Sequence, residues 1–225
     1  MSSPTKYTLE EKIDFIREES KNVIVLTGPT GSGKGLIINF LTTNYKIRDL
    51  PFITTRNLRD GEAESGSKQV KTLEFLMMEY SGKLFLSVSN YGNLYGYDLD
   101  IVYAALKNDE IIILEAPPGR IITEVDTLLP QSTKLAVIPP NNFSKETLKV
   151  RNTESDSTQT LRHLLGEAEI EELRFACAHS KVFPILPTLG EPEWSLKQVK
   201  RIIDLEFKEN ISSKDSSNNI TEINA

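Results

Sequence analysis

Apolar residues fall into short blocks along the chain, and the blocks alternate between two spacings. Nearly continuous apolar runs predict strands at NVIVLTG (22–28), EIIILEA (110–116), KLAVIPP (134–140) and KVFPILP (181–187). Between them, apolar residues recur at helical spacing in LDIVYAALKN, RIITEVDTLL, LRHLLGEAEIEELRFACAH and EWSLKQVKRIIDLEF. Strands that alternate with helices predict an α/β fold in which helices flank a parallel sheet.

A less regular stretch follows the first of these strands and its helix. PFITTR (51–56) and KLFLSVSN (83–90) predict strands, and the polar, glycine-containing NLRDGEAESGSK predicts turns. The spacing in KTLEFLMMEYSG predicts an amphipathic helix, with Met77 and Met78 expected to fill the core. YGNLYGYD (91–98) is expected to form a turn.

The two ends and one internal segment carry further signals. Thr8 and Glu11 have the spacing of a capping box at the start of a helix. Residues 142–162 are polar and charged with few apolar anchors, which favours a mobile lid at about 141–162. The tail 208–225 has the composition of a disordered segment, so we expect one domain over residues 1–207.

Composition narrows the classes of partner. The chain has 225 residues and a formal net charge of −6, which argues against a nucleic acid or an anionic membrane as partner. The N-terminus lacks the apolar run that a secretion signal requires, so we expect a cytoplasmic protein. The single cysteine, Cys177, excludes an internal disulfide and is expected to be a packed thiol.

The segment GPTGSGK (28–34) predicts a phosphate-binding loop. Glycines at 28, 31 and 33 allow backbone N–H groups to converge on a polyphosphate, and Lys34 supplies a mobile positive charge. The pattern alone is weak, but it lies directly between a predicted strand and a predicted helix, whose positive dipole end would face the same phosphates. The residues expected to bind the nucleotide are Gly28, Thr30, Gly31, Ser32, Gly33, Lys34 and Gly35.

Gly35 stands where such loops carry the Ser or Thr that ligates magnesium, and Leu36 excludes the variant in which Gly-Thr follows the lysine. The metal must therefore be held by other groups, or poorly. Glu115 and Asp98 are the candidate carboxylates, because Glu115 ends a predicted strand at the edge of the sheet where ligands bind in open α/β folds.

From about residue 22 to 207 the chain resembles the guanylate kinases, a family with the P-loop NTPase fold and small acceptor-binding and lid insertions. Four blocks carry the resemblance: GPTGSGKG, ITTRNLRDGE, YGNLYG and RNTESDSTQTLR. It implies that Arg56, Arg59 and Tyr95 bind the phosphate of an acceptor, within a region at about 48–97. It also implies that Arg151 and Arg162, in the lid, neutralise charge on the transferring phosphoryl group together with Lys34.

The departures from the family fall where guanine is read. Leu86 replaces the glutamate that accepts hydrogen bonds from guanine, Tyr97 replaces a Ser or Thr, and Phe52 replaces a serine. Gln69 stands for a second phosphate-binding tyrosine, and EAPPG replaces the family's Asp-x-x-Gly. Without those polar groups, the basis for selecting guanine is lost.

The leading hypothesis is therefore an ATP- and Mg²⁺-dependent kinase of a phosphorylated small molecule, expected to be a nucleoside monophosphate other than GMP. A sugar phosphate acceptor, as in the ribose bisphosphate kinases of the same fold, is a related alternative. The rival hypothesis is a catalytically degenerate module that binds a nucleotide or a protein, which Gly35 and the lost base reader favour. A P-loop hydrolase has less support, since no water-positioning residue is evident.

Overall fold

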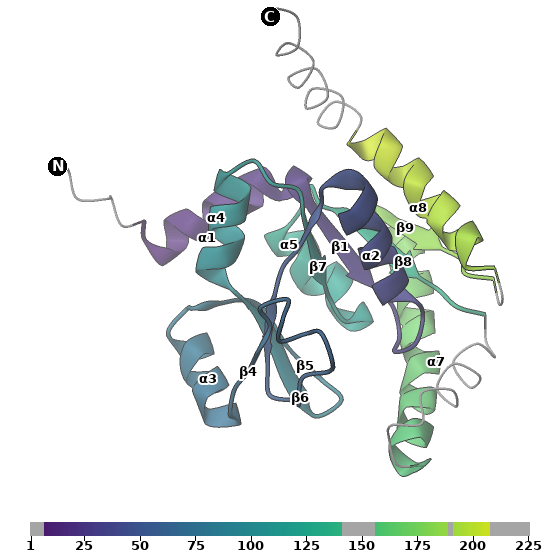
Figure 1. Ribbon diagram of the computed structural model, residues 1–225, viewed down its shortest axis with the longest axis horizontal. Coiled ribbons are helices and arrows are strands. Elements are labelled where there is room, and N and C mark those ends of the chain that lie inside the picture. The colour runs from purple at the N-terminus through teal and green to yellow at the C-terminus, as the bar shows by residue number, and fades with distance from the viewer. Residues whose placement is uncertain (1–6, 141–155, 189–190, 208–225) are drawn as a thin grey trace, which may run out of the picture.

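A computed structural model describes residues 7–140, 156–188 and 191–207, with the backbone alone for 121–122 and 156–165. Of the predicted lid at 141–162, residues 141–155 lie outside the described residues and residues 156–162 begin helix α7; the predicted tail at 208–225 also lies outside the described residues. Among the described residues, a larger and a smaller sheet lie next to each other, and helices flank the larger one on both faces (Figure 1).

The larger sheet is parallel, as the alternation of strands and helices predicts. Within the described ranges five strands form it, in the order β2-β7-β1-β8-β9. Their bounds are Arg48–Asp49 (β2), Ile112–Glu115 (β7), Val23–Thr27 (β1), Thr133–Val137 (β8) and Val182–Ile185 (β9). Strand β1, in the middle, is buried at every residue, because neighbouring strands cover its edges and helices cover its faces.

Successive residues of β1 point to opposite faces of the sheet and enter two separate cores. Val23 and Val25 pack in the core that includes residues of α1, α4 and α7, whereas Ile24 and Leu26 pack in the core that includes residues of α2 and α8. The bounds of the α-helices are Leu9–Glu18 (α1), Lys34–Tyr45 (α2), Thr72–Tyr80 (α3), Leu99–Lys107 (α4), Asp126–Leu128 (α5), Asp156–His179 (α7) and Pro192–Glu206 (α8). Shorter helical turns are Glu19–Asn22 (η1), Pro118–Arg120 (η2) and Ile121–Val125 (η3).

Several local predictions are confirmed. The Thr8 hydroxyl accepts from the backbone N–H of Glu11, and the Glu11 carboxylate accepts from that of Thr8, which is the predicted capping box. Cys177 lies in α7, partly buried against the first core, and burial raises the pKa of its thiol.

The smaller sheet has the strand order β4-β3-β6-β5 in the described chain and lies beside α3 (Figure 1). Its strands are Lys68–Gln69 (β4), Phe52–Thr54 (β3), Asn93–Asp98 (β6) and Leu84–Asn90 (β5). The prediction of a turn over residues 91–98 was wrong: the turn is confined to Tyr91 and Gly92, and the rest is β6. Its Gly and Asn residues suggested a turn, but pairing with β3 and β5 on both sides makes this segment a strand.

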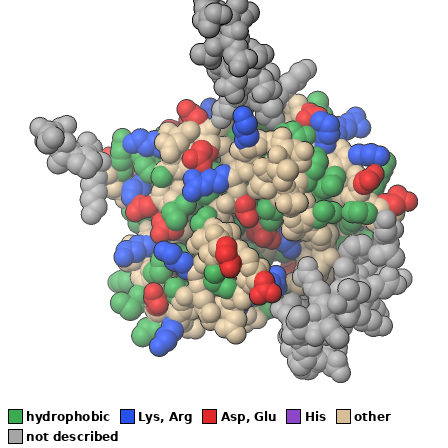
Figure 2. All heavy atoms as spheres, in the orientation of Figure 1, with side chains coloured by type: hydrophobic (Ala, Val, Ile, Leu, Met, Phe, Trp, Pro, Cys, Tyr) green, Lys and Arg blue, Asp and Glu red, His purple; other side chains and the backbone are tan. Residues whose placement is uncertain are grey.

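Helix α3 forms as predicted, but its burial was predicted wrongly. Phe75 is buried, whereas Met77 is 65% exposed and therefore does not fill the core; Met78 is partly buried. Leu73, Leu76 and Tyr80 are exposed as well, and hydrophobic side chains reach the surface in this region (Figure 2). Helical spacing of apolar residues thus identified the helix but could not show whether other elements cover its apolar side chains.

These differences in burial predict that replacing Leu by Ala lowers the free energy of unfolding by different amounts at different positions. Leu114→Ala, at a fully buried position of β7, is expected to lower the free energy of unfolding by about 2–5 kcal/mol, because it leaves a cavity between packed layers. Leu73→Ala, at a position that is 71% exposed on α3, is the matched control and is expected to change it by less than about 0.5 kcal/mol. Urea unfolding followed by circular dichroism measures both, and equal costs would contradict the assignment of the core.

Candidate functional site

The predicted phosphate-binding loop connects β1 to α2. Gly31 and Gly33 have φ values of 83° and 96°, a left-handed region that glycine adopts without strain. Gly28 is required for space: a Cβ there would lie 2.8 Å from Ser32 Oγ and 2.9 Å from the backbone oxygen of Val137. The loop therefore folds tightly over the end of the central strand, and α2 begins directly after it.

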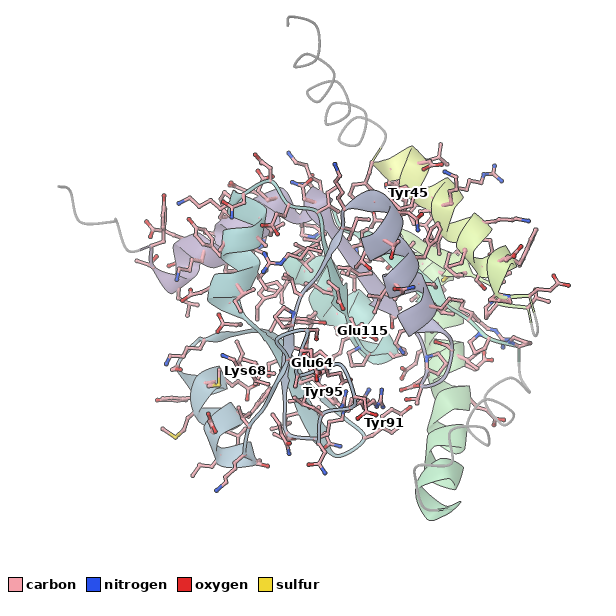
Figure 3. All side chains as sticks on the ribbon, viewed as in Figure 1. Tyr45, Glu64, Lys68, Tyr91, Tyr95 and Glu115 are labelled. Carbon is pink, nitrogen blue, oxygen red and sulfur yellow. The ribbon has the colours of Figure 1, made fainter. Side chains whose placement is uncertain are left out.

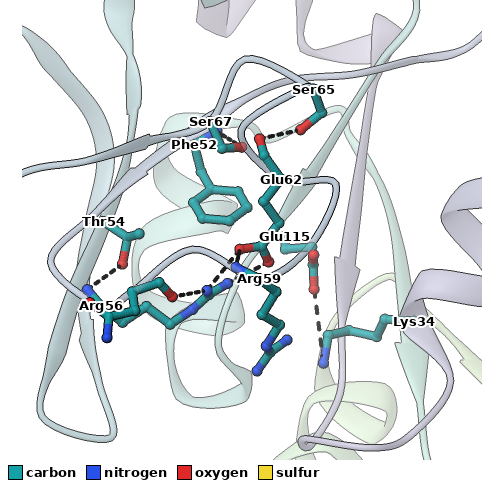
Figure 4. Close-up of polar contacts among 10 residues, drawn as sticks. Lys34, Phe52, Thr54, Arg56, Arg59, Glu62, Ser65, Ser67 and Glu115 are labelled. Carbon is teal, nitrogen blue, oxygen red and sulfur yellow. Dashed lines mark hydrogen bonds and ion pairs between the residues drawn. The ribbon is translucent and has the colours of Figure 1, made fainter.

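Lys34, the first residue of α2, bends back over this loop. Its Nζ donates hydrogen bonds to the backbone oxygens of Gly28, at 2.7 Å, and Pro29, at 3.2 Å. It also lies 3.9 Å from Glu115 Oε2, at the end of β7 (Figure 4). The lysine is thus held at the carboxyl edge of the sheet by two neutral carbonyls and one carboxylate.

The loop has groups suited to an anionic ligand. Within the described chain, the hydroxyls of Thr27 and Ser32 are buried and have no hydrogen-bond partner. Buried polar groups ordinarily have partners, so these hydroxyls suit a ligand with acceptor oxygens. At Gly35 a Cβ would meet no atom within 4 Å, so packing does not exclude the Ser or Thr that such loops carry there.

A cavity of about 170 Å³ lies between the loop and the smaller sheet. It brings together nine of the predicted site residues: Gly28, Thr30, Lys34, Arg56, Arg59, Leu86, Tyr95, Tyr97 and Glu115. Its wall also contains Phe52, Glu62, Val88, Asn90, Tyr91, Gly96, Ala116 and Pro117. We call this space the site cavity; Tyr91 and Tyr95 lie on the smaller sheet and Glu115 on the larger one (Figure 3).

Arg56 is fixed in the wall of the site cavity by a carboxylate. Its Nη2 and Nη1 atoms lie 2.6 Å and 2.8 Å from the two oxygens of Glu62, and Nη1 also donates to the backbone oxygen of Asn57 at 2.7 Å. Burial alone would lower the pKa of Arg56, but the hydrogen bonds and charge of Glu62 raise it above its usual value. Glu62 also accepts from the backbone N–H of Arg59 at 2.7 Å, so one carboxylate bonds to the side chain of one predicted phosphate-binding arginine and to the backbone of the other.

Figure 4 shows the Arg59 side chain extending toward the same space as Lys34. Glu62 itself was absent from the predicted site residues. The available signal was its place in ITTRNLRDGE, at the end of the block that contains both arginines.

The wall of the site cavity formed by Phe52, Leu86 and Tyr97 is apolar or aromatic. Leu86 has a φ of +50° at an irregularity of pairing between Phe85 and Val88, and such bulges redirect side chains next to sites. The Tyr97 hydroxyl accepts from the backbone N–H of Glu115 at 2.7 Å and donates to its carbonyl at 3.3 Å. Because both bonds go to the backbone, this hydroxyl is already engaged.

Two further carboxylates were not foreseen, Asp49 beside Glu115 and Glu169 beside Lys34. Asp49 in β2 pairs with Ile113 of β7, which places it on the same face of the sheet as Glu115, two residues further along. Although Asp49 reaches solvent, the protein around it and the charge of Glu115 raise its pKa to about 6. In α7, burial raises the pKa of Glu169, opposed by the nearby Tyr91 hydroxyl and by the charge of Lys34.

Other predicted residues lie elsewhere. Gln69 is not among the residues lining the site cavity; its side-chain amide donates to Asn57 at 2.8 Å, and its predicted role stays untested. Asp98 is the N-cap of α4, accepts from two backbone N–H groups and is not among the residues lining the site cavity; its predicted role as a metal ligand stays untested. Arg151 lies outside the described residues, and Arg162 belongs to α7 but its side chain is not described.

The sequence and the fold were each compared with those of known proteins. No protein-family model matches the chain. Guanylate kinases match it with 27% identity in Shouchella clausii, over 85% of this chain and 91% of that protein, and with 31% identity in Bacillus subtilis, over 66% and 74%. The crystal structure of guanylate kinase from Anaplasma phagocytophilum superposes with a TM-score of 0.55 at 18% identity, covering 82% of this chain and 85% of that one.

The fold and the site together define a P-loop phosphotransferase of the nucleoside monophosphate kinase type. The chain belongs to the guanylate kinase family.

None of the helices in the described ranges of the chain has both the length and the apolar character needed to cross a membrane.

The raised pKa of Asp49 predicts a pH-dependent stability. A pKa near 6, against an ordinary 3.8, means that between these values the folded state binds more protons than the unfolded chain. The free energy of unfolding therefore rises as the pH falls through this range. Asp49→Asn is expected to stabilise the protein by about 1 kcal/mol at pH 8, after allowance for solvent screening, with the gain disappearing near pH 4.

Urea unfolding from pH 4 to 8 measures this effect, with Asp60→Asn, in an exposed turn, as the control. A gain that is the same at pH 4 and pH 8 would show that the charge of Asp49 is not its cause.

Proposed function

We propose that this protein transfers the γ-phosphoryl group of ATP to the phosphate of a small molecule, a nucleoside monophosphate other than GMP. An acceptor phosphate oxygen forms the new bond to phosphorus as the bond to the β-phosphate oxygen breaks, which leaves ADP. The observation that carries the proposal is the site cavity, in which Lys34 and both arginines of the acceptor block line one space. Kinases of this kind act by aligning two anionic ligands and stabilising the charge between them.

The donor end of the site cavity is assigned to ATP. The glycines of the loop, the two unpartnered hydroxyls and Lys34 suit a polyphosphate at the start of α2. The related guanylate kinases support a nucleotide donor by analogy. Arg151 and Arg162 are proposed, from the resemblance of the lid block, to neutralise the transferring group.

The acceptor end is assigned from Arg56, Arg59 and Tyr95. A guanidinium group binds a phosphate through two parallel hydrogen bonds, and two arginines three residues apart can converge on one phosphate. The fixed geometry of Arg56 supports such a role, because a preorganised donor loses less entropy on binding.

The proposed preference against GMP rests on the other wall of the site cavity. Leu86 and Tyr97 face it where the family has hydrogen-bonding residues, and the Tyr97 hydroxyl is engaged by Glu115. The polar edge of guanine would then lack hydrogen-bond partners. A site without those partners selects guanine only weakly over other bases.

Magnesium would be held near Glu115, the carboxylate next to Lys34. The described residues contain no group of three or more His, Cys, Asp or Glu side chains arranged for a metal, so water and nucleotide oxygens would complete the shell, as is usual for this ion. When bound, Mg²⁺ neutralises charge on the phosphates. Gly35 is the observation that favours the second candidate, a nucleotide-binding module without transfer activity.

Activity assays separate the two candidates. ADP release with ATP and each of AMP, CMP, UMP, GMP and ribose phosphates is expected to identify an acceptor other than GMP. Lys34→Ala is expected to lower kcat by about a hundredfold or more, since it removes a charge aimed at the transferring group. The control is Lys197→Ala, an exposed position on α8. Absence of turnover with every acceptor, together with retained ATP binding, would favour the non-catalytic module.

Substitution of the base-reading position tests the specificity. Leu86→Glu is expected to raise kcat/KM for GMP by about tenfold, because one hydrogen bond to a charged group contributes about 1.5–3 kcal/mol. Leu86→Met keeps the position apolar and is expected to give no gain. If the wild-type protein already prefers GMP, the proposed specificity is wrong.

A further inference from the structure

The ring of Phe52 lies against the guanidinium group of Arg56. It lies in β3 opposite Tyr97 of β6, on the same face as Thr54, which is opposite Tyr95. The centre of the Arg56 guanidinium lies 5.4 Å from the centroid of the Phe52 ring and 5.9 Å from that of Tyr95. The two rings are 6.4 Å apart, so both flank the same cation.

These rings restrict Arg56 in a direction that Glu62 does not. The carboxylate holds the guanidinium through its N–H groups, which lie in the plane of the group. An aromatic ring interacts with a cation through the negative potential of its face and packs against the weakly hydrated guanidinium surface. The carboxylate and the rings together therefore limit both the translation and the tilt of Arg56.

The contact also leaves donors for a ligand. The bonds to Glu62 and Asn57 use three of the five N–H donors of a guanidinium group, and the Tyr95 hydroxyl also interacts with it. Arg56, Phe52 and Tyr95 all line the site cavity, where the proposed acceptor phosphate would lie. The Arg56 side chain is only 15% exposed, so its orientation is set by these neighbours more than by water.

We propose that Phe52 is a positioning residue for the acceptor phosphate, acting through Arg56; the proposal rests on the proposed function of the site cavity. The ring holds the guanidinium at the tilt in which its remaining N–H groups face the phosphate. The same ring occupies a wall position at which the resemblance to guanylate kinases places a serine. One substitution thus removes a polar group near the acceptor and strengthens the grip on its phosphate.

The test compares three variants. Phe52→Leu keeps an apolar side chain of similar size but removes the aromatic face, and Phe52→Tyr restores a ring. Phe183→Leu is the matched control. Phe183 lies on the distant strand β9, is also partly buried, and has its ring centroid 5.7 Å from Lys181 Nζ. Thermal unfolding of each variant checks that the fold is retained.

The primary measurement uses inorganic phosphate as the probe, followed through the Arg56 Nε–H resonance by NMR. Phe52→Leu is expected to reduce the ring-current shift of this resonance to the part contributed by Tyr95 and to raise the dissociation constant for phosphate reported by it about tenfold. Phe52→Tyr and Phe183→Leu are expected to stay within about twofold of the wild type. The backbone amides of residues 31–34 report phosphate at the donor loop separately and are expected to respond equally in all variants.

Kinetics supply the second measurement. With whichever monophosphate the wild type phosphorylates, Phe52→Leu is expected to raise the acceptor KM about tenfold while the KM for ATP is unchanged. An unchanged phosphate affinity and ring-current shift in Phe52→Leu would overturn the proposal. So would a loss seen only with nucleotides and not with inorganic phosphate, because the ring would then act on the base. If no monophosphate is turned over, the proposed function fails, and the phosphate titration still decides the role of Phe52.

Discussion

The position of the site depends on strand β1, which is buried along its whole length between β7 and β8. Its two faces enter separate cores, so the strand has no freedom to shift by a residue without exposing both. Because the sheet is parallel, the ends of β1, β2 and β7 meet at one edge, and the phosphate loop, Asp49 and Glu115 lie together there. The smaller sheet then has only to bring its arginines to that edge.

The cations of the site cavity are held in different ways at its two ends. Arg56 has a two-point bond to a carboxylate and aromatic rings around it, whereas Lys34 is held mainly by neutral carbonyls, with Glu115 at 3.9 Å. The planar guanidinium is fixed in orientation by its paired bonds to a carboxylate, whereas the Lys34 ammonium is a compact charge at the end of a flexible stem. This suits a reaction in which an acceptor phosphate is held in one orientation while a phosphoryl group is transferred to it.

Much of the fold follows from local sequence. The features that could not be predicted share one physical cause, which is contact between segments far apart in the chain. Continuous apolar runs identified β1, β7 and β8, and strand, glycine loop and helix in direct succession identified the phosphate loop. The strand β6 was missed because only pairing on both sides makes it one, and the exposure of Met77 was missed because spacing does not show whether a helix has a partner. The same holds in the site: the raised pKa of Asp49 and the ring over Arg56 arise from pairing between distant segments.

The two bonds between the Tyr97 hydroxyl and the backbone of Glu115 join the smaller sheet to the larger one, and Phe85, Leu86 and Tyr97 pack in the same core as residues of β1 and β7. Tyr97 is next to the last residue of β6, whereas the turn at Tyr91 and Gly92 lies at the other end of that strand. The wall of the site cavity at Tyr97 and Glu115 therefore belongs to both sheets at once. A ligand that rests against this wall touches the acceptor region and the nucleotide-binding sheet together, so the two ends of the reaction share one fixed reference surface.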